Sequence, residues 1–214
     1  MSAMGFRQAG LLGVASAILH FATSSPAAAG PGVALGGGVV TQTLSERQSL
    51  SLTPWFALRG KITDSWSVFT RIGYEHHSAP VAMAVCLGPG CPTSADAEER
   101  VTYVPASLGV RLSTANAFLE IASSIAWTRF EDNVELGYDD GRKLKVLRSS
   151  DHLLPEVGLG AGFHHTLTGA LGAEWGLRFA YRSAPRETEA NRSLVSERDG
   201  IASWSLVAAL TLGP

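Results

Sequence analysis

The chain has 214 residues, enough for one domain, and only 17% of them are charged, whereas about 25% are charged in a typical soluble domain. A net charge of −2 gives no electrostatic argument for a nucleic-acid partner. Mean hydropathy is +0.12, yet no stretch has the ~18 consecutive apolar residues that indicate a membrane-spanning helix. The chain also has 23 glycines, which disfavour helix interiors. A chain that is apolar on average, with its apolar residues spread along the sequence, is typical of a membrane β-barrel.

The first 29 residues have the pattern of a cleaved signal peptide. Arg7 is their only charge, residues 9–22 form an apolar run, and residues 27–29 are alanines suited to cleavage. The apolar run is too short for a membrane anchor, and a buried N-terminal helix is the alternative interpretation. We therefore expect residues 1–29 to be a signal peptide and residues 30–214 to form one exported domain.

Eight segments of the exported domain alternate with the period of two that is typical of strands. In residues 171–181, Trp175 and Phe179 share an apolar face, whereas Glu174 and Arg178 lie on the opposite face among small residues. On a helix these four residues would be neighbours and no apolar stripe would form, so a strand is favoured. The expected strands are residues 32–43, 50–59, 66–75, 103–112, 118–127, 153–163, 171–181 and 203–212.

The connections between these segments alternate in length. Residues 60–64, 113–116 and 164–169 are short turns, and residues 44–48 are the short exception in the other set of connections. The long, polar and charged connections are residues 78–100, 131–150 and 183–199. Membrane barrels have this arrangement, with short periplasmic turns at one rim and long loops outside, so both termini are expected on the periplasmic side.

The two strand faces differ in a way that orients the barrel wall. One face is apolar and the other consists mostly of Gly, Ala, Ser and Thr with occasional charges, which suits a narrow interior better than a solvated exterior. The apolar face also carries aromatic residues that favour the lipid headgroup boundary: Trp66, Tyr74, Trp127, Phe163, Tyr181 and Trp204. The alternative is a soluble barrel with its apolar face inside. We predict an all-β, eight-stranded antiparallel up-and-down transmembrane β-barrel.

Charged residues of both signs fall on the predicted inward face. They are Arg59, Arg71, Glu75, Arg111, Glu120, Glu156, Glu174, Arg178 and Arg182. Buried charges need partners, so we expect a network of ion pairs. Such a network could line a proton or ion path, but eight strands leave little more room than their own side chains fill, which favours an interior plug.

Two cysteines are present, in the sequence Cys-Leu-Gly-Pro-Gly-Cys. In an oxidising compartment this spacing favours a disulfide between Cys86 and Cys91 that closes a loop tip. A metal site that also uses His76 and His77 is the alternative. No cofactor is expected.

The alternation, the unequal loops and the signal peptide resemble the small outer-membrane barrels of the OmpA/OmpX kind. The resemblance covers the mature chain but depends on no diagnostic motif, and the chain ends Leu-Thr-Leu-Gly-Pro without the usual terminal aromatic residue. It implies a monomer in the outer membrane of a Gram-negative bacterium. The implied partners are outer-membrane lipid, lipopolysaccharide and the barrel assembly machinery.

The function expected from these features is a non-enzymatic barrel whose loops contact the environment, envelope lipid or a partner. Arg142, Lys143, Lys145 and Arg148 could pair with lipopolysaccharide phosphates. Acidic residues nearby lack the spacing of a calcium loop. A small-solute or hydrophobic-compound channel is one alternative.

A lipid A-modifying enzyme is another alternative. His164, His165 and Thr166, with Glu174, have the residue types of a nucleophile, a base and an orienting group. Lipid A deacylase barrels have Ser in a similar arrangement, whereas this chain has Thr. The group also falls at a predicted periplasmic turn, away from outer-leaflet lipid, so a polar turn is the favoured interpretation.

Overall fold

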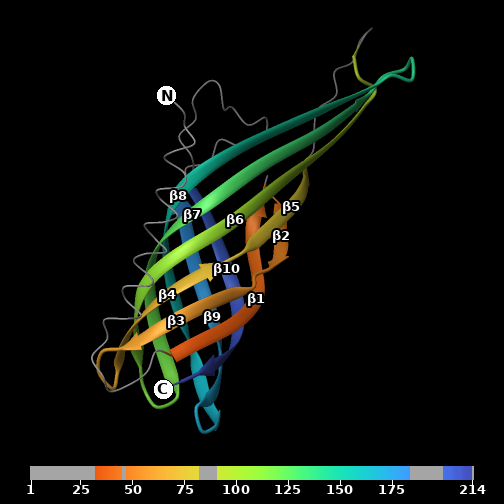
Figure 1. Cartoon of the computed structure of the whole chain (residues 1–214). Coiled ribbons are helices and arrows are strands. Elements are labelled where there is room, and N and C mark those ends of the chain that lie inside the picture. Colours follow the sequence, from red (N-terminus) through yellow and green to blue (C-terminus); the bar gives the residue numbers. More distant parts are fainter. Residues whose placement is uncertain (1–31, 45–46, 82–90, 184–199, 214) are drawn as a thin grey trace, which may run out of the picture.

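The computed structural model describes residues 32–44, 47–81, 91–183 and 200–213, which form one antiparallel sheet (Figure 1). Its strands are β1 (Gly32–Leu44), β2 (Arg47–Leu52), β3 (Trp55–Lys61), β4 (Trp66–Gly73), β5 (Glu75–Val81), β6 (Ser94–Ser113), β7 (Ala117–Gly137), β8 (Lys143–Thr168), β9 (Leu171–Ser183) and β10 (Gly200–Leu212). No helix among the described residues is long and apolar enough to cross a membrane. The predicted signal peptide, residues 1–29, lies outside the described residues.

The strand pairing closes the sheet into a barrel. The order is β1–β3–β4–β6–β7–β8–β9–β10, and β10 pairs back with β1, with Leu210 opposite Leu35. Along the chain, β2 leads into β3 across Thr53 and Pro54, and β4 leads into β5 across Tyr74. Counted this way, the described residues form eight antiparallel up-and-down strands. The predicted fold class is confirmed.

The barrel wall continues past the breaks between β2 and β3 and between β4 and β5, although β2 and β5 are joined differently from the other strands. Beyond the breaks, β2 pairs with β1 and β5 pairs with β6. Between β2 and β5, the Ser49 hydroxyl donates to the Ser78 carbonyl oxygen at 3.1 Å, and the His76 backbone N–H donates to the Ser51 hydroxyl at 3.1 Å. Side-chain hydroxyls thus bridge this seam, whereas backbone ladders join the paired strands.

Burial alternates along the barrel strands as the sequence predicts, most regularly in the barrel part of β7. In β7, Leu119 and Ile121 are about 60% exposed, whereas Phe118, Glu120 and Ala122 are buried. The core is therefore the barrel lumen, and the apolar face points outward.

Three strands are much longer than predicted. β6, β7 and β8 continue beyond the other strands as a three-stranded projection, which we call the arm (Figure 1). The prediction that residues 131–150 form a long loop is wrong, because β7 and β8 pair as far as Gly137 and Lys143, and only residues 138–142 turn. The alternation continues here, with Val134 opposite Val146, but charged residues on the other face conceal it.

The opposite end of the barrel, which we call the turn end, has short connections at residues 62–65, 114–116 and 169–170. Thr63 Oγ1 accepts a hydrogen bond from the Trp66 N–H at 3.0 Å, and Gly169 has a φ of 52°, a conformation that favours glycine. The third predicted turn, residues 164–169, is wrong in extent, since His164 and the following residues belong to β8. His164, His165 and Thr166 are polar, yet they stay paired with β9 at the end of the barrel.

Candidate functional site

The outward face carries a continuous apolar band. Its most exposed members include Leu35, Leu50, Leu52, Ile72, Leu108, Leu119, Ile121, Ile125, Leu153, Val157, Leu159, Leu177, Leu206, Leu210 and Leu212. No charged residue is exposed in segments 33–39, 50–58, 66–74, 104–112, 119–127, 153–163, 171–181 and 204–212. A strand crosses a bilayer in about 9–11 residues, so the band has the height of a hydrocarbon core.

The six predicted aromatic residues lie on this outward face. At the turn end, Phe163 and Trp175 are cross-strand neighbours with ring centroids 4.8 Å apart. Toward the arm, Trp204 packs on Phe179 with centroids 4.7 Å apart. Aromatic rings near both edges of the band match the positions of lipid headgroups.

Inside the lumen, the first ion-pair group is the turn-end cluster of Arg59, Arg111 and Glu174. Arg59 donates from Nη1 and Nη2 to the two Glu174 carboxylate oxygens at 2.5 and 2.6 Å. Arg111 donates to the same two oxygens at 3.0 and 2.7 Å. All three side chains are at most 13% exposed, and the Arg111 guanidinium lies 3.6 Å from the Phe118 ring centroid. Two fork-shaped guanidiniums therefore share one carboxylate.

The middle cluster consists of Arg71, Glu120 and Arg178. Arg71 Nη2 and Arg178 Nε donate to Glu120 Oε1 at 2.7 and 2.8 Å. The indole of Trp55 faces the Arg178 guanidinium at 4.3 Å and that of Arg71 at 5.2 Å from its ring centroid. Cation–π contacts thus supplement a single carboxylate between two arginines.

The arm-end cluster consists of Glu75, Glu156 and Arg182. Arg182, which is 1% exposed, donates from Nη2 to Glu75 Oε2 at 2.9 Å and from Nε to Glu156 Oε2. The Arg182 guanidinium also lies 4.2 Å from the Tyr103 ring centroid. Here one arginine serves two carboxylates, the reverse of the other clusters.

Sequence reasoning missed several polar residues around the arm-end cluster. Gln42 Nε2 donates to the Tyr103 hydroxyl at 2.7 Å, and the fully buried His77 has Nε2 at 3.8 Å from Glu75 Oε2. Glu99 and Asp132 are also buried. The detectable signal was the alternation that continues from Tyr103 through Val101 to Glu99.

The nine charged residues predicted for the interior thus lie in three ion-pair clusters along the lumen. The cavity that remains beside the middle and arm-end clusters measures about 70 Å³. This volume holds a few water molecules at most. The ion pairs occupy this part of the lumen and connect strands on different sides of it.

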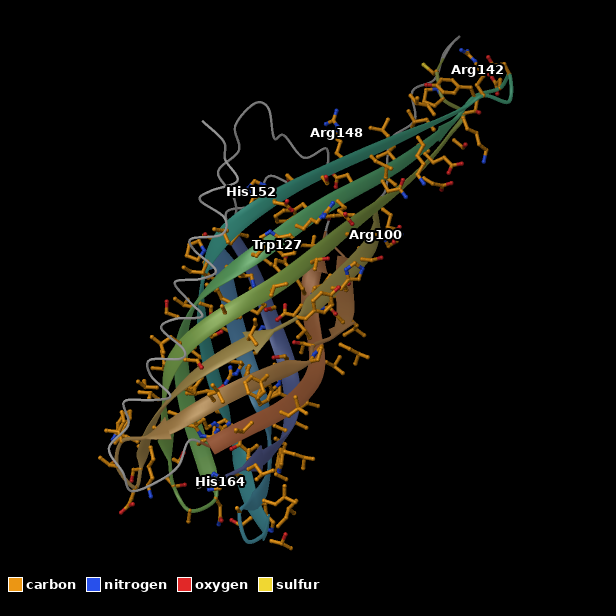
Figure 2. All side chains as sticks on the ribbon, in the orientation of Figure 1. Arg100, Trp127, Arg142, Arg148, His152 and His164 are labelled. Atoms are coloured by element: carbon orange, nitrogen blue, oxygen red, sulfur yellow. The ribbon has the colours of Figure 1, made fainter. Side chains whose placement is uncertain are left out.

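A larger concavity of about 540 Å³, the turn-end basin, opens beside the turn-end cluster and includes His164, His165 and Thr166 in its lining. Figure 2 shows His164 at the turn end, far from the arm. His164 lies opposite Glu174 in the β8–β9 ladder, but Glu174 already accepts four hydrogen bonds from arginines. Glu174 is therefore bound to the arginines rather than free to orient a catalytic histidine.

The outward face of the arm carries exposed ion pairs. The Arg100 side chain donates to Glu98 at 2.7 Å and lowers the pKa of that carboxyl, and Lys143 does the same for Glu135 at 2.8 Å. Of the predicted basic group, Arg142 pairs with Asp140 and Lys143 with Glu135, while Lys145 and Arg148 are exposed. Figure 2 places Arg142 at the arm tip and Arg148 farther down.

The alternative metal site is not assembled among the described residues. Consecutive strand residues point to opposite faces, so His76 contacts Thr102 Oγ1 at 3.0 Å on the outside, whereas His77 is buried in the lumen. No group of three metal-ligating side chains occurs in the described part of the chain. Cys91 precedes β6, but Cys86 lies outside the described residues, so the disulfide stays a prediction.

No protein-family model and no curated protein sequence matches the chain. Among solved structures, it is similar to Neisserial surface protein A, with a TM-score of 0.45 and 11% identity over 85% of this chain and 96% of the other. It is also similar to Ail, the attachment invasion locus protein of Yersinia pestis, with a TM-score of 0.46 and 10% identity over 85% and 97%. The outer membrane enzyme PagL gives a TM-score of 0.40 and 16% identity over 83% and 97%. The eight-stranded architecture itself rests on the pairing of this chain's own strands.

Proposed function

We propose that this chain is an outer-membrane β-barrel protein of a Gram-negative bacterium, neither a pore nor an enzyme, which acts through its arm and the surface loops expected from its sequence. The observation that carries the proposal is the distribution of polarity. Apolar side chains cover the outer surface of the band without an exposed charge, and ion pairs lie inside the lumen. A soluble barrel has the opposite arrangement, so a bilayer is the solvent that this outer surface requires.

Electrophoresis of the full chain from the membrane fraction, with and without boiling in detergent, tests the barrel in the membrane. We expect a shift in mobility on boiling, because the closed ladder resists detergent until it is heated. Folded protein in the aqueous fraction without detergent would contradict the proposal.

A pair of matched substitutions tests which surface meets lipid. Ile121 lies in the apolar band and Leu147 on the arm, and their side chains are 60% and 70% exposed. Ile121→Arg places a charge in the hydrocarbon core, at a cost of about 2–4 kcal/mol, so less folded protein should reach the outer membrane. Leu147→Arg should have no such effect. Equal yields for both variants would argue against the assigned band.

The closed lumen separates this proposal from a channel. Planar-bilayer recording of the folded protein should show no steady large conductance, because the clusters occupy the lumen and the cavity beside the middle and arm-end clusters measures only about 70 Å³. A stable open conductance would favour the small-solute channel instead.

Lipid A analysis separates the proposal from a lipid-modifying enzyme. Mass spectrometry of lipid A from cells with and without the protein should give the same acyl pattern. An altered pattern that is lost in a His164→Ala variant would overturn the non-enzymatic assignment and return attention to the histidines of the turn-end basin.

The proposal includes export and contact with the envelope. We expect cleavage after residue 29, insertion by the barrel assembly machinery, and a Cys86–Cys91 disulfide. N-terminal sequencing of the mature protein and its intact mass before and after reduction check the first and the last. The exposed Lys145 and Arg148 support contact of the arm with lipopolysaccharide.

A further inference from the structure

The three lumen clusters differ in the sign of their net charge. The turn-end and middle clusters each contain two arginines and one glutamate, whereas the arm-end cluster contains one arginine and two glutamates. Each of the first two therefore has a net charge of +1, and the third has −1. Positive charge is concentrated at the turn end of the lumen.

The turn-end basin opens directly onto this positive charge. Arg59, Arg111 and Glu174 line its deeper part, since their side chains are at most 13% exposed, and Lys61 lies at the rim with a 40% exposed side chain. The lining also includes His164 and hydroxyl groups: Thr63, Ser113, Thr114 and Thr166. The basin thus combines three cations with two carboxylates, Glu174 and Asp64, and with neutral hydrogen-bond donors.

The Glu174 carboxylate does not balance the two arginines that it binds, and the second carboxylate of the lining, Asp64, is exposed and pairs with Lys61 at 2.8 Å. A carboxylate offers about four lone-pair sites, and those of Glu174 are occupied by four arginine N–H groups. One positive charge remains uncompensated in a poorly solvated place, where Coulomb interactions are strong. His164 Nδ1 is buried there and has no hydrogen-bond partner among the described residues.

We propose that the turn-end basin binds a phosphate group, either as inorganic phosphate or as a small phosphate monoester. Guanidinium groups bind phosphate oxygens with two parallel hydrogen bonds, and a phosphate group offers more acceptor oxygens to the guanidinium, ammonium and hydroxyl groups of the lining than a carboxylate does. The basin volume of about 540 Å³ leaves space for an organic substituent on the phosphate. This site is independent of the contacts proposed for the arm.

The test uses the full folded chain in a phosphate-free maltoside detergent at constant ionic strength. Inorganic phosphate, glycerol 3-phosphate and acetate are added separately, and binding is followed by the NMR signals of His164 and His165 and by calorimetry. Saturable binding of either phosphate, with no response to acetate, supports the proposal. The relative affinities of the two phosphates distinguish a free ion from a phosphorylated molecule.

Two substitutions give opposite expected signs. Arg59→Gln should weaken phosphate binding at least tenfold, because it removes a guanidinium. Glu174→Gln should strengthen binding at least threefold, because it removes the competing carboxylate and keeps its shape. Should Arg59→Gln fail to fold, Lys61→Gln at the exposed rim should weaken binding severalfold. Lys143→Gln on the arm is the control and should leave the affinity unchanged.

If Arg59 and Glu174 had only a structural role, the two substitutions would not change the phosphate affinity in opposite directions. The proposal is overturned by the absence of saturable phosphate binding, by an equal response to acetate, or by a Glu174→Gln variant that folds and binds more weakly.

Discussion

Gly160 faces the lumen beside the middle cluster, where a side chain has no room. A Cβ at this position would lie 2.6 Å from Glu120 Cγ, the residue that holds Arg71 and Arg178 together. Gly160→Ala should therefore displace Glu120 and destabilise the barrel by about 1–3 kcal/mol. Urea unfolding in detergent, followed by tryptophan fluorescence, measures this change.

Gly60→Ala is the matched control, because its Cβ would be 3.6 Å from the nearest atom of Val68, an ordinary contact. It should change the free energy of unfolding by less than about 0.5 kcal/mol. A Gly160→Ala variant as stable as Gly60→Ala would show that the middle cluster tolerates rearrangement.

Arg182 links Glu75 to Glu156 by donating a hydrogen bond to each carboxylate. Arg182→Met leaves two carboxylates buried without their partner, so we expect a loss of about 3–5 kcal/mol in stability. The same substitution at Arg100, whose ion pair with Glu98 is exposed, should cost less than about 1 kcal/mol.

Neutralising Glu75 and Glu156 tests whether the charge of Arg182 is what stabilises the arm-end cluster. Adding Glu75→Gln and Glu156→Gln to Arg182→Met should recover part of the lost stability, since no buried charge then remains in that cluster. The absence of any recovery would mean that packing of the long Arg182 side chain, rather than its charge, holds this part of the barrel.

At the residue scale, the sequence identified the inward charges but not their partners. Alternation fixes which face a side chain occupies, so Arg59 and Glu174 could be assigned to the lumen. Their contact joins residues 115 positions apart, on β3 and β9, and depends on strand tilt and stagger. Such pairing across a lumen is a property of the closed barrel and leaves no local pattern.

At the element scale, the seam between β2 and β5 is the part of the wall that depends on side chains. Ser51 accepts the His76 N–H, so Ser51→Ala removes that partner and should cost about 1 kcal/mol. Amide hydrogen exchange at His76 should become faster, because local opening of β5 then needs less free energy.

Ser123→Ala serves as the control for the seam, since Ser123 is exposed on β7 within a continuous ladder. It should leave exchange at His76 unchanged. Unaltered exchange in Ser51→Ala as well would show that the seam is held by other contacts.

The strand breaks and the arm also show where sequence patterns stop being informative. Pro54 lacks an N–H and interrupts the ladder, yet its carbonyl oxygen accepts the Tyr74 N–H at 3.1 Å, so the alternation of flanking residues survives and one strand was predicted. On the arm, by contrast, a loop is predicted where the structure has strands. Charged outer residues such as Glu131 and Lys145 suit solvent on a strand face as well as in a loop, and only the opposite face, with Val134 and Val146, carries strand character.

At the scale of the whole molecule, the structure predicts an orientation in the membrane. The apolar band ends near the short turns on one side, whereas the arm continues well beyond it on the other (Figure 1). Outer-membrane β-barrels have short turns on the periplasmic side and longer loops on the extracellular side, and the arm with its charged tip matches a long extracellular hairpin. The arm should therefore lie outside the cell.

Epitope tags inserted at the two ends test this orientation. One tag is placed at Gly141, an exposed residue with φ 80° in the arm-tip turn, and the other at Gly169 in a turn-end connection, where a Cβ would also meet open space. Antibody should label the Gly141 tag on intact cells and the Gly169 tag only after the outer membrane is permeabilised. Retained mobility shift on boiling verifies that both tagged proteins fold. The reverse labelling would place the turn-end basin outside the cell, where extracellular rather than periplasmic phosphate compounds would reach Arg59 and Arg111.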